Sequence, residues 1–157
     1  MTRQVKTYNP NHVFVDTNVL IGAYSGDARY QTDSDCLHYL YSIVGKRLYI
    51  STLSVAQLIS VYQKRKTNEE IRDIVRELQY RFTIINFTVK DIDAALDQTG
   101  ADIEDNVQFV LARKQKCHVI ITNRSNLFAC HSKNYKDYRL LLGAQIIKPS
   151  KVRTIAR

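Results

Sequence analysis

The stretch Val13-Phe14-Val15-Asp16-Thr17-Asn18-Val19-Leu20 decides the fold of this chain. Three apolar residues that favour β-structure end at an aspartate, and apolar residues at helical spacing follow immediately, as far as Tyr24. Packing of the core requires no charge at that point. In open α/β sheets, ligands bind at the carboxyl ends of the strands, so Asp16 lies where a functional group is expected. A plain N-cap of the following helix is the alternative interpretation.

The rest of the chain repeats this alternation of strand and helix. Further short apolar strands are expected near residues 48–50, 82–87, 119–121 and 145–147, with helices near 33–45, 52–62, 71–78 and 88–97 and another beginning at Asp102. Such alternation predicts right-handed crossovers and a parallel sheet, and uniformly apolar strands indicate a sheet covered on both faces. We therefore expect residues 1–157 to form a single α/β domain, a three-layer α/β/α sandwich around a mainly parallel sheet of about five strands.

The composition is that of a soluble globular protein. Apolar residues make up 45% of the chain and charged residues 24%, and no apolar run approaches the length of a membrane span. The first residues lack the apolar centre of a signal peptide, so a cytoplasmic location without a membrane partner is expected. Three cysteines without a framework spacing indicate reduced thiols rather than disulfides or a zinc site.

The chain carries a net charge of +8, which favours a polyanionic partner such as RNA. The excess is uneven, since residues 133–157 contain seven Lys or Arg and one acid. Cations there could meet phosphates, and the tyrosines between them could stack on unpaired bases. A solvated surface segment whose tyrosines point inward is an equally open interpretation. The predicted RNA-binding residues are Lys133, Tyr135, Lys136, Tyr138 and Arg139.

Polar residues gather at three places that a parallel sheet would bring to one edge if its first and fourth strands are neighbours. They are Asp16 after the first strand, Asp102, Glu104 and Asp105 at the start of a helix, and Thr122, Asn123 and Arg124 after the fourth strand. Converging carboxylates repel one another unless a divalent cation neutralises them. Mg²⁺ or Mn²⁺ prefers hard oxygen ligands and can activate water for attack on phosphorus. We expect Asp16 and Asp105 to bind such a cation, with Asp102 or Glu104 assisting through water. The alternative is a structural role, in which the acids at the start of the helix only stabilise it by interacting with the positive end of its dipole.

The same segments resemble the motifs of PIN domains, the fold of VapC-like toxin ribonucleases. The opening stretch resembles the first motif, and residues 102–106 with Ala112 resemble the third. Residues 119–122 leading to Phe128 resemble the fourth motif, and residues 143–149 resemble the closing strand. This resemblance implies a three-layer α/β/α fold in which about four acids hold one or two divalent metals and RNA phosphodiesters are cut. It also implies an antitoxin-like protein partner and a homodimer as possible assemblies.

The chain departs from that acidic pattern at two positions. Asp16 matches the first acid and Asp105 the third, so both are carried over as catalytic residues. The second position reads Gln57, and the residues just after Thr122 include no carboxylate. One lost charge interaction in such a site typically costs about 10²–10³ in rate. We expect the following residues to line the pocket: Asn18, Gln57, Thr122, Asn123 and Arg124. Because the helix around Gln57 is apolar on two sides, that amide is expected to be buried, as a former ligand or as a satisfied core residue.

The sequence leaves the enzymatic status open between two functions. The first is an impaired Mg²⁺- or Mn²⁺-dependent endoribonuclease, and the second is a catalytically inactive PIN domain that binds RNA or a protein partner. A Rossmann-like binder of small molecules is disfavoured, because no glycine-rich phosphate turn follows the first strand.

Overall fold

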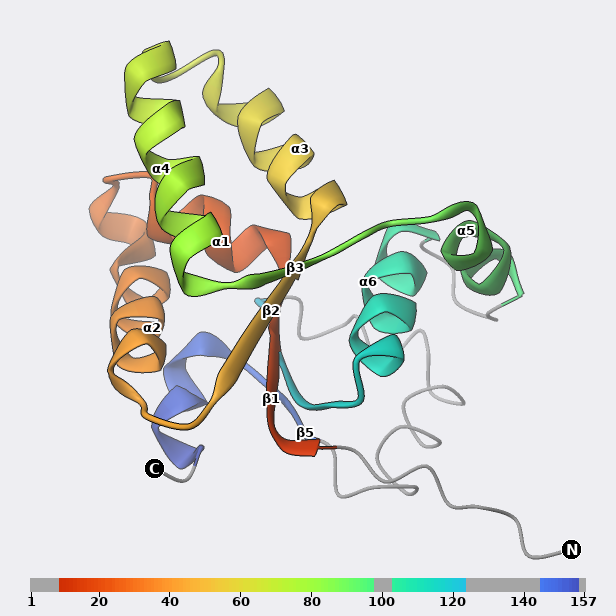
Figure 1. Cartoon of the computed structure of the whole chain (residues 1–157). Coiled ribbons are helices and arrows are strands. Elements are labelled where there is room, and N and C mark those ends of the chain that lie inside the picture. The colour runs from red at the N-terminus through yellow and green to blue at the C-terminus, as the bar shows by residue number, and fades with distance from the viewer. Residues whose placement is uncertain (1–8, 98–102, 124–144, 156–157) are drawn as a thin grey trace, which may run out of the picture.

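A five-stranded sheet forms the centre of the molecule in the computed structural model, which describes residues 9–97, 103–123 and 145–155 (Figure 1). The strands are β1 (Asn9–Val15), β2 (Arg47–Ser51), β3 (Thr83–Ile85), β4 (Cys117–Ile121) and β5 (Gln145–Ile147). They are ordered β3-β2-β1-β4-β5, and every neighbouring pair is parallel. The expected α/β class and its parallel sheet are confirmed, and β1 and β4 are neighbours, as the site prediction requires.

Helices cover both faces of this sheet, which gives the expected three layers (Figure 1). One face carries α1 (Thr17–Ala23), α2 (Gln31–Ser42), α3 (Thr52–Tyr62) and α4 (Asn68–Arg81), with the short 3-10 helices η1 (Ala28–Tyr30) and η2 (Pro149–Thr154). The other face carries α5 (Val89–Leu96) and α6 (Ile103–Lys114). In the described ranges, no helix has the length and apolar character needed to cross a membrane.

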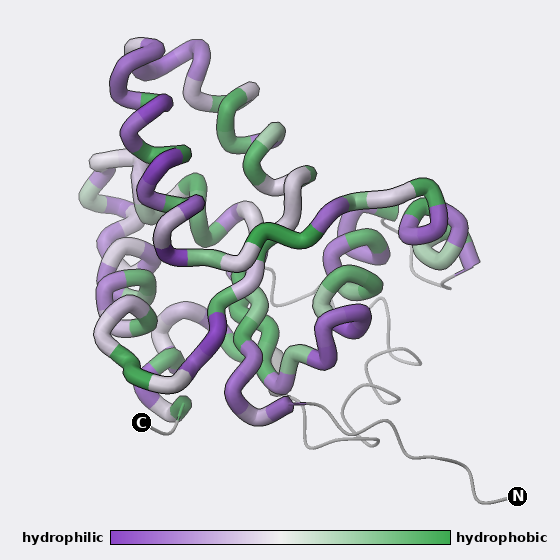
Figure 2. The backbone as a smooth tube through the Cα atoms, in the orientation of Figure 1, coloured by the Kyte–Doolittle hydropathy of each residue, from purple (hydrophilic) through white to green (hydrophobic). Residues whose placement is uncertain are grey.

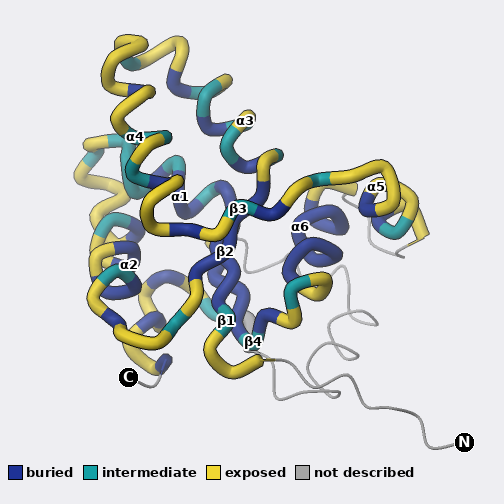
Figure 3. Tube along the Cα trace, in the orientation of Figure 1, coloured by how far each residue is buried: buried dark blue, intermediate teal, exposed yellow. Residues whose placement is uncertain are grey.

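Alternation along the strands divides the core into two parts. Val13 and Val15 of β1 pack among the residues under α1–α4, whereas Phe14 between them packs against α6 on the opposite face. The hydrophobic strands at the centre contrast with the largely hydrophilic α4 (Figure 2). In Figure 3 most of β2 and β4 and the end of β1 are buried, and so is most of α6, in which every residue from 105 to 112 is buried. A helix buried all round holds its polar residues in fixed positions.

The ends of several elements follow local signals in the sequence. Ser51 caps α3 by accepting a hydrogen bond from the Ser54 backbone, and Thr88 with Asp91 forms the expected capping box of α5. The third strand is shorter than expected, since β3 covers only 83–85. Phe82 instead ends α4, because its backbone N–H donates to the Leu78 carbonyl.

Asp91 also ties α5 to α6, which makes it a residue of measurable importance for stability. Its Oδ2 accepts hydrogen bonds from the Thr88 backbone at 2.8 Å and from the Thr88 hydroxyl at 2.9 Å, and Lys114 Nζ lies 3.2 Å away. Burial raises the pKa of Asp91, but the Thr88 hydrogen bonds and Lys114 outweigh it and leave the pKa below its usual value.

Asp91→Asn is therefore expected to lower the free energy of unfolding by about 1–2 kcal/mol at pH 7. Since a depressed carboxylate pKa stabilises the fold above the unfolded pKa, the difference should be constant above about pH 5 and shrink as the pH falls further. Urea unfolding across this pH range measures it, with the exposed Asp93→Asn of the same helix as the control. A loss of stability that does not change with pH would contradict this account of Asp91.

Candidate active site

A pocket of about 360 Å³ opens at the carboxyl edge of the sheet. Three segments far apart in the chain line it: the start of α1 after β1, the middle of α3, and the first turn of α6. The lining residues are Asp16, Thr17, Asn18, Ile21, Gln57, Ser60, Val61, Glu104 and Asp105. We call this the acid pocket. It brings together five of the residues singled out from the sequence: Asp16, Asn18, Gln57, Glu104 and Asp105.

Asp16 is held firmly at the mouth of β1. Its Oδ1 accepts a hydrogen bond from the Thr17 backbone at 2.8 Å, so it is indeed the N-cap of α1. Its Oδ2 accepts from Asn18 Nδ2 at 3.0 Å and from the Thr122 hydroxyl at 2.8 Å. The Asp16 carboxylate therefore both caps α1 and lines the acid pocket, so the two interpretations of this residue do not exclude each other. Thr122, which follows β4, acts on the pocket through Asp16 and fixes its orientation.

The two acids of α6 differ in their surroundings. Asp105 is buried, with 8% of its surface exposed, whereas Glu104 is exposed. Both lie in the first turn of α6, which is packed against the sheet and α5, so the helix delivers them to the same pocket as Asp16. The expected meeting of Asp16 and Asp105 is thus present in the structure, while their catalytic and metal-binding roles stay predictions.

Gln57 is half-buried rather than buried, which corrects the expectation from helical spacing. The buried residues of α3 are Ser54, Leu58 and Tyr62, and this leaves the next face, with Gln57, turned to the acid pocket. The Gln57 carbonyl accepts from the Thr17 hydroxyl at 3.0 Å, and its amide nitrogen donates to Glu104 Oε1 at 2.8 Å. At the position of the missing second acid, the chain thus presents a hydrogen-bond donor to a neighbouring carboxylate.

A buried polar network beneath the pocket was not predicted from the sequence. Gln108 of α6 donates to the Thr17 hydroxyl at 2.9 Å and to the Ser54 hydroxyl at 3.3 Å, and these two hydroxyls lie 2.7 Å apart. Within the described residues, the Gln108 carbonyl oxygen is buried without a hydrogen-bond partner, which is unusual for a folded protein. The available signal was spacing, because Gln108 lies one helical turn after Glu104 on the same face.

Asn123 lies outside the acid pocket, contrary to the expectation that it lines the same pocket. Its backbone N–H donates to Asn18 Oδ1 at 3.2 Å, but its side-chain amide donates to Asp33 Oδ1 at 2.8 Å in an adjoining pocket. The remaining predicted site residues lie outside the described residues. They are Asp102, Arg124, Lys133, Tyr135, Lys136, Tyr138 and Arg139.

The chemistry of the acid pocket is compatible with a hard divalent cation. Carboxylates of Asp16, Glu104 and Asp105 line one small pocket, and carboxylate oxygens are the ligands that Mg²⁺ and Mn²⁺ prefer. Across residues 9–97, 103–123 and 145–155, however, no three His, Cys, Asp or Glu side chains are arranged to hold a metal ion. The residues present fit a cation held by few protein ligands and water rather than a closed protein site.

Comparisons with known proteins agree with the fold described above. Ribonuclease VapC1 of Aquifex aeolicus (strain VF5) is 25% identical over 137 residues, which cover 77% of this chain and 87% of that protein. The crystal structure of Mycobacterium tuberculosis VapC20, a toxin that cleaves the sarcin-ricin loop, has a TM-score of 0.59 at 17% identity. That match covers 74% of this chain and 93% of VapC20, and it supports the fold. The family model for the PIN domain matches residues 13–128, from the second half of β1 to beyond β4, and the chain therefore belongs to the PIN domain family.

Proposed function

We propose that this protein is a toxin-like endoribonuclease of low turnover that depends on Mg²⁺ or Mn²⁺. The observation that supports this best is the convergence of Asp16, Glu104 and Asp105, from separate segments, on one pocket at the carboxyl edge of a parallel sheet. RNA as the substrate is supported by the similarity to a ribonuclease and to a toxin that cleaves the sarcin-ricin loop. The net charge of +8 also favours a polyanion.

In this proposal, Asp16 and Asp105 hold the cation and Glu104 assists through water. The bound cation supplies an activated water and neutralises charge that develops on the phosphate. The chain itself orients the pocket: Thr17, Asn18 and Thr122 fix the Asp16 carboxylate by the three hydrogen bonds described above. The buried surroundings of Asp105 exclude bulk water from its side of the pocket.

The low turnover follows from the contacts of Gln57. An amide neutralises no part of a cation's charge, and its carbonyl is already engaged by the Thr17 hydroxyl. Its amide nitrogen donates a hydrogen bond to Glu104 Oε1, so that oxygen is less available to bind a cation. The loss of one such charge interaction costs about 10²–10³ in rate. We further propose a cytoplasmic location, RNA contacts by residues 133–139, and an antitoxin-like protein or a second copy of the chain as partners.

The proposal is tested by incubating the native chain with structured RNA in Mg²⁺, in Mn²⁺ and in EDTA. Slow cleavage at a few positions is expected with either metal, and none is expected after chelation, because the two aspartates supply no activated water on their own. Heat-unfolded protein is the control for contaminating nucleases. Cleavage that continues unchanged in EDTA would refute metal dependence.

A second function is favoured by one specific contact. The hydrogen bond of 2.8 Å from the Gln57 amide to Glu104 gives one of the pocket carboxylates a partner without a metal ion. This arrangement suits an inactive PIN domain that only binds RNA or a protein. That function predicts RNA binding that EDTA leaves unchanged, together with no metal-dependent products. The same RNA, used in a binding assay and a cleavage assay side by side, separates the two functions.

A further inference from the structure

A second pocket of about 560 Å³ lies beside the acid pocket and shares Asn18 and Ile21 with it. It is enclosed by α1, η1, the beginning of α2, the turn after α3, the residues after β4 and the start of η2. We call it the basic pocket, because Arg29, Arg65 and Lys148 all line it and Asp33 is the acid among its lining residues. A polyanion that crosses the acid pocket would thus meet cations directly beside it.

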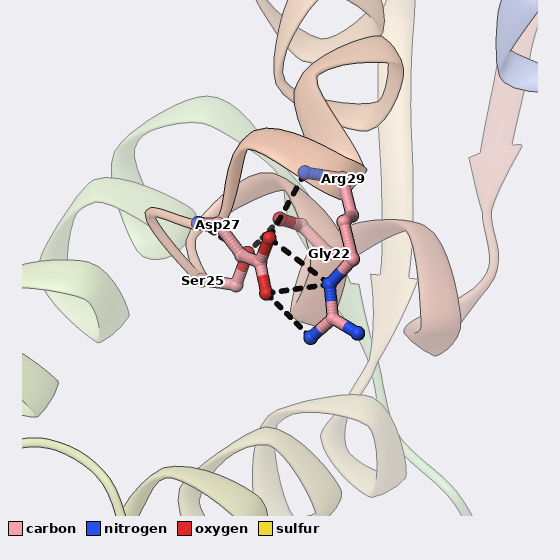
Figure 4. Close-up of polar contacts among 4 residues, drawn as sticks. All are labelled: Gly22, Ser25, Asp27 and Arg29. Atoms are coloured by element: carbon pink, nitrogen blue, oxygen red, sulfur yellow. Dashed lines mark hydrogen bonds and ion pairs between the residues drawn. The ribbon is translucent and has the colours of Figure 1, made fainter.

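The turn between α1 and α2 holds Arg29 in a defined orientation (Figure 4). The Asp27 carboxylate accepts from Arg29 Nε at 3.0 Å and from Nη2 at 2.7 Å, while its other oxygen caps η1 by accepting from the Arg29 backbone. Ser25 supports this turn, since its hydroxyl donates to the Gly22 carbonyl at 2.7 Å and accepts from the Asp27 backbone at 3.1 Å. These contacts use one edge of the guanidinium and leave Nη1 out of the pair. An exposed pair of this kind adds little stability, but it preorganises the arginine for a phosphate.

An aromatic surface lies next to this arginine. Tyr30 lines the same pocket, and 42% of its surface is exposed although it is a large ring. The Arg29 guanidinium carbon lies 5.6 Å from the centroid of the Tyr30 ring. A cation beside a partly exposed ring is a common arrangement for binding single-stranded nucleic acid, because the ring stacks on a base and the cation meets the backbone.

Asp33 places a carboxyl group in a buried position where packing of the core requires none. Only 3% of its surface is exposed, and in the described part of the chain its hydrogen-bond partner is the neutral amide of Asn123, with no ion pair. Gly22 makes room for it, since a Cβ atom there would lie 1.9 Å from Asp33 Oδ2. Burial raises the pKa of Asp33, against the smaller lowering by Asn123. A carboxylate kept in such a place at an energetic cost, and lining a pocket, is suited to accept hydrogen bonds from a ligand.

We propose that the basic pocket binds the RNA nucleotide next to the cleaved bond and prefers cytosine to uracil there. Arg29, Arg65 and Lys148 meet its phosphates, and Tyr30 stacks on its base. Asp33 accepts a hydrogen bond from the amino group at C4 of cytosine, whereas the carbonyl oxygen of uracil at that position would repel the carboxylate. This proposal rests on the proposed function, because it requires RNA to cross the neighbouring acid pocket.

The test is binding of ten-nucleotide oligo(C) and oligo(U), measured by fluorescence anisotropy in EDTA so that no cleavage occurs. The native chain is expected to bind oligo(C) about ten-fold more tightly. Asp33→Asn, which keeps the shape and removes the charge, is expected to bring this ratio close to one. Arg65→Ala should weaken the binding of both oligomers alike, by about three- to ten-fold. It should also reduce the slope of log affinity against log salt concentration by about the value of one phosphate contact. The control is Arg72→Ala, an exposed arginine of α4 that lines neither pocket.

Equal affinity of the native chain for the two oligomers overturns the proposal, as does an Arg65→Ala variant that binds like Arg72→Ala. Should Asp33→Asn fail to fold, Tyr30→Ala tests the same pocket, because that ring is partly exposed; unchanged affinity there also counts against it. Failure of the proposed function has a different signature. A cytosine preference without any metal-dependent cleavage would refute the proposed nuclease activity and support nucleotide binding in the basic pocket. Metal-dependent cleavage without the preference would support the nuclease activity and refute the role of the basic pocket.

Discussion

Asp16→Asn is expected to reduce metal-dependent RNA cleavage by about 10²–10³-fold. The substitution keeps the size of the side chain and removes the negative charge at the centre of the acid pocket. Asparagine is as good an N-cap as aspartate, so α1 should keep its start. Its amide nitrogen would face the Asn18 donor in place of Oδ2, so the free energy of unfolding should fall by about 1–2 kcal/mol while the chain stays folded. Single-turnover cleavage of one labelled RNA, with protein in excess, measures the effect on the chemical step.

The matched control for this experiment is Asp73→Asn. Asp73 is 72% exposed on α4 and lies 3.8 Å from Arg76 in a surface ion pair, so its loss changes the net charge by the same amount at a distant place. It should cleave like the native chain. If Asp16→Asn also cleaves like the native chain, the acid pocket is not the active site, and a different part of the molecule must carry any nuclease activity.

The parallel α/β sheet and the meeting of Asp16 with Asp105 could be predicted because both depend on pattern. Apolar strands alternating with helices leave few topologies, and the carboxyl ends of neighbouring parallel strands share one edge. Asp16 after β1 and the acids before β4 were therefore expected together once β1 and β4 were taken as neighbours. The capping box of α5 was likewise predictable from local sequence, since Thr88 and Asp91 lie within one turn.

The contacts of Gln57, Gln108 and Asp33 could not be predicted, because their partners come from other parts of the chain. Gln57 reaches Glu104 across 47 positions, and Gln108 reaches Thr17 across 91. Helical spacing indicated that Gln57 is enclosed, but not that Ser54, Leu58 and Tyr62 form the buried face instead. Asp33 looks like an ordinary acid in the first turn of a helix, and only the approach of Gly22 and Asn123 buries it.

Restoring the second acid is the strongest test of why this chain should be a poor nuclease. Gln57→Glu replaces the donor that now lies 2.8 Å from Glu104 with a second carboxylate. Without metal, the like charges should lower the melting temperature, because the hydrogen bond is lost and repulsion takes its place. With Mn²⁺ at 100 times its Kd, binding should add about 2.7 kcal/mol of stability, which corresponds to about 5–10 °C. Calorimetry is expected to show at least ten-fold tighter Mn²⁺ binding than in the native chain, and cleavage should rise by up to about 10²-fold.

Gln57→Met distinguishes the effect of the added charge from the effect of losing the hydrogen bond to Glu104. It removes the hydrogen bond to Glu104 and keeps a side chain of similar length, but adds no carboxylate, so it should gain neither Mn²⁺ affinity nor metal-dependent stability. A response to Mn²⁺ in the glutamate variant alone would identify the missing charge at position 57 as the limit on metal binding. Equal responses in the two variants would mean that the Gln57–Glu104 hydrogen bond itself limits metal access. No gain in either variant would show that the acid pocket is not a metal site, because a fourth carboxylate beside Asp16, Glu104 and Asp105 must strengthen the binding of any cation there.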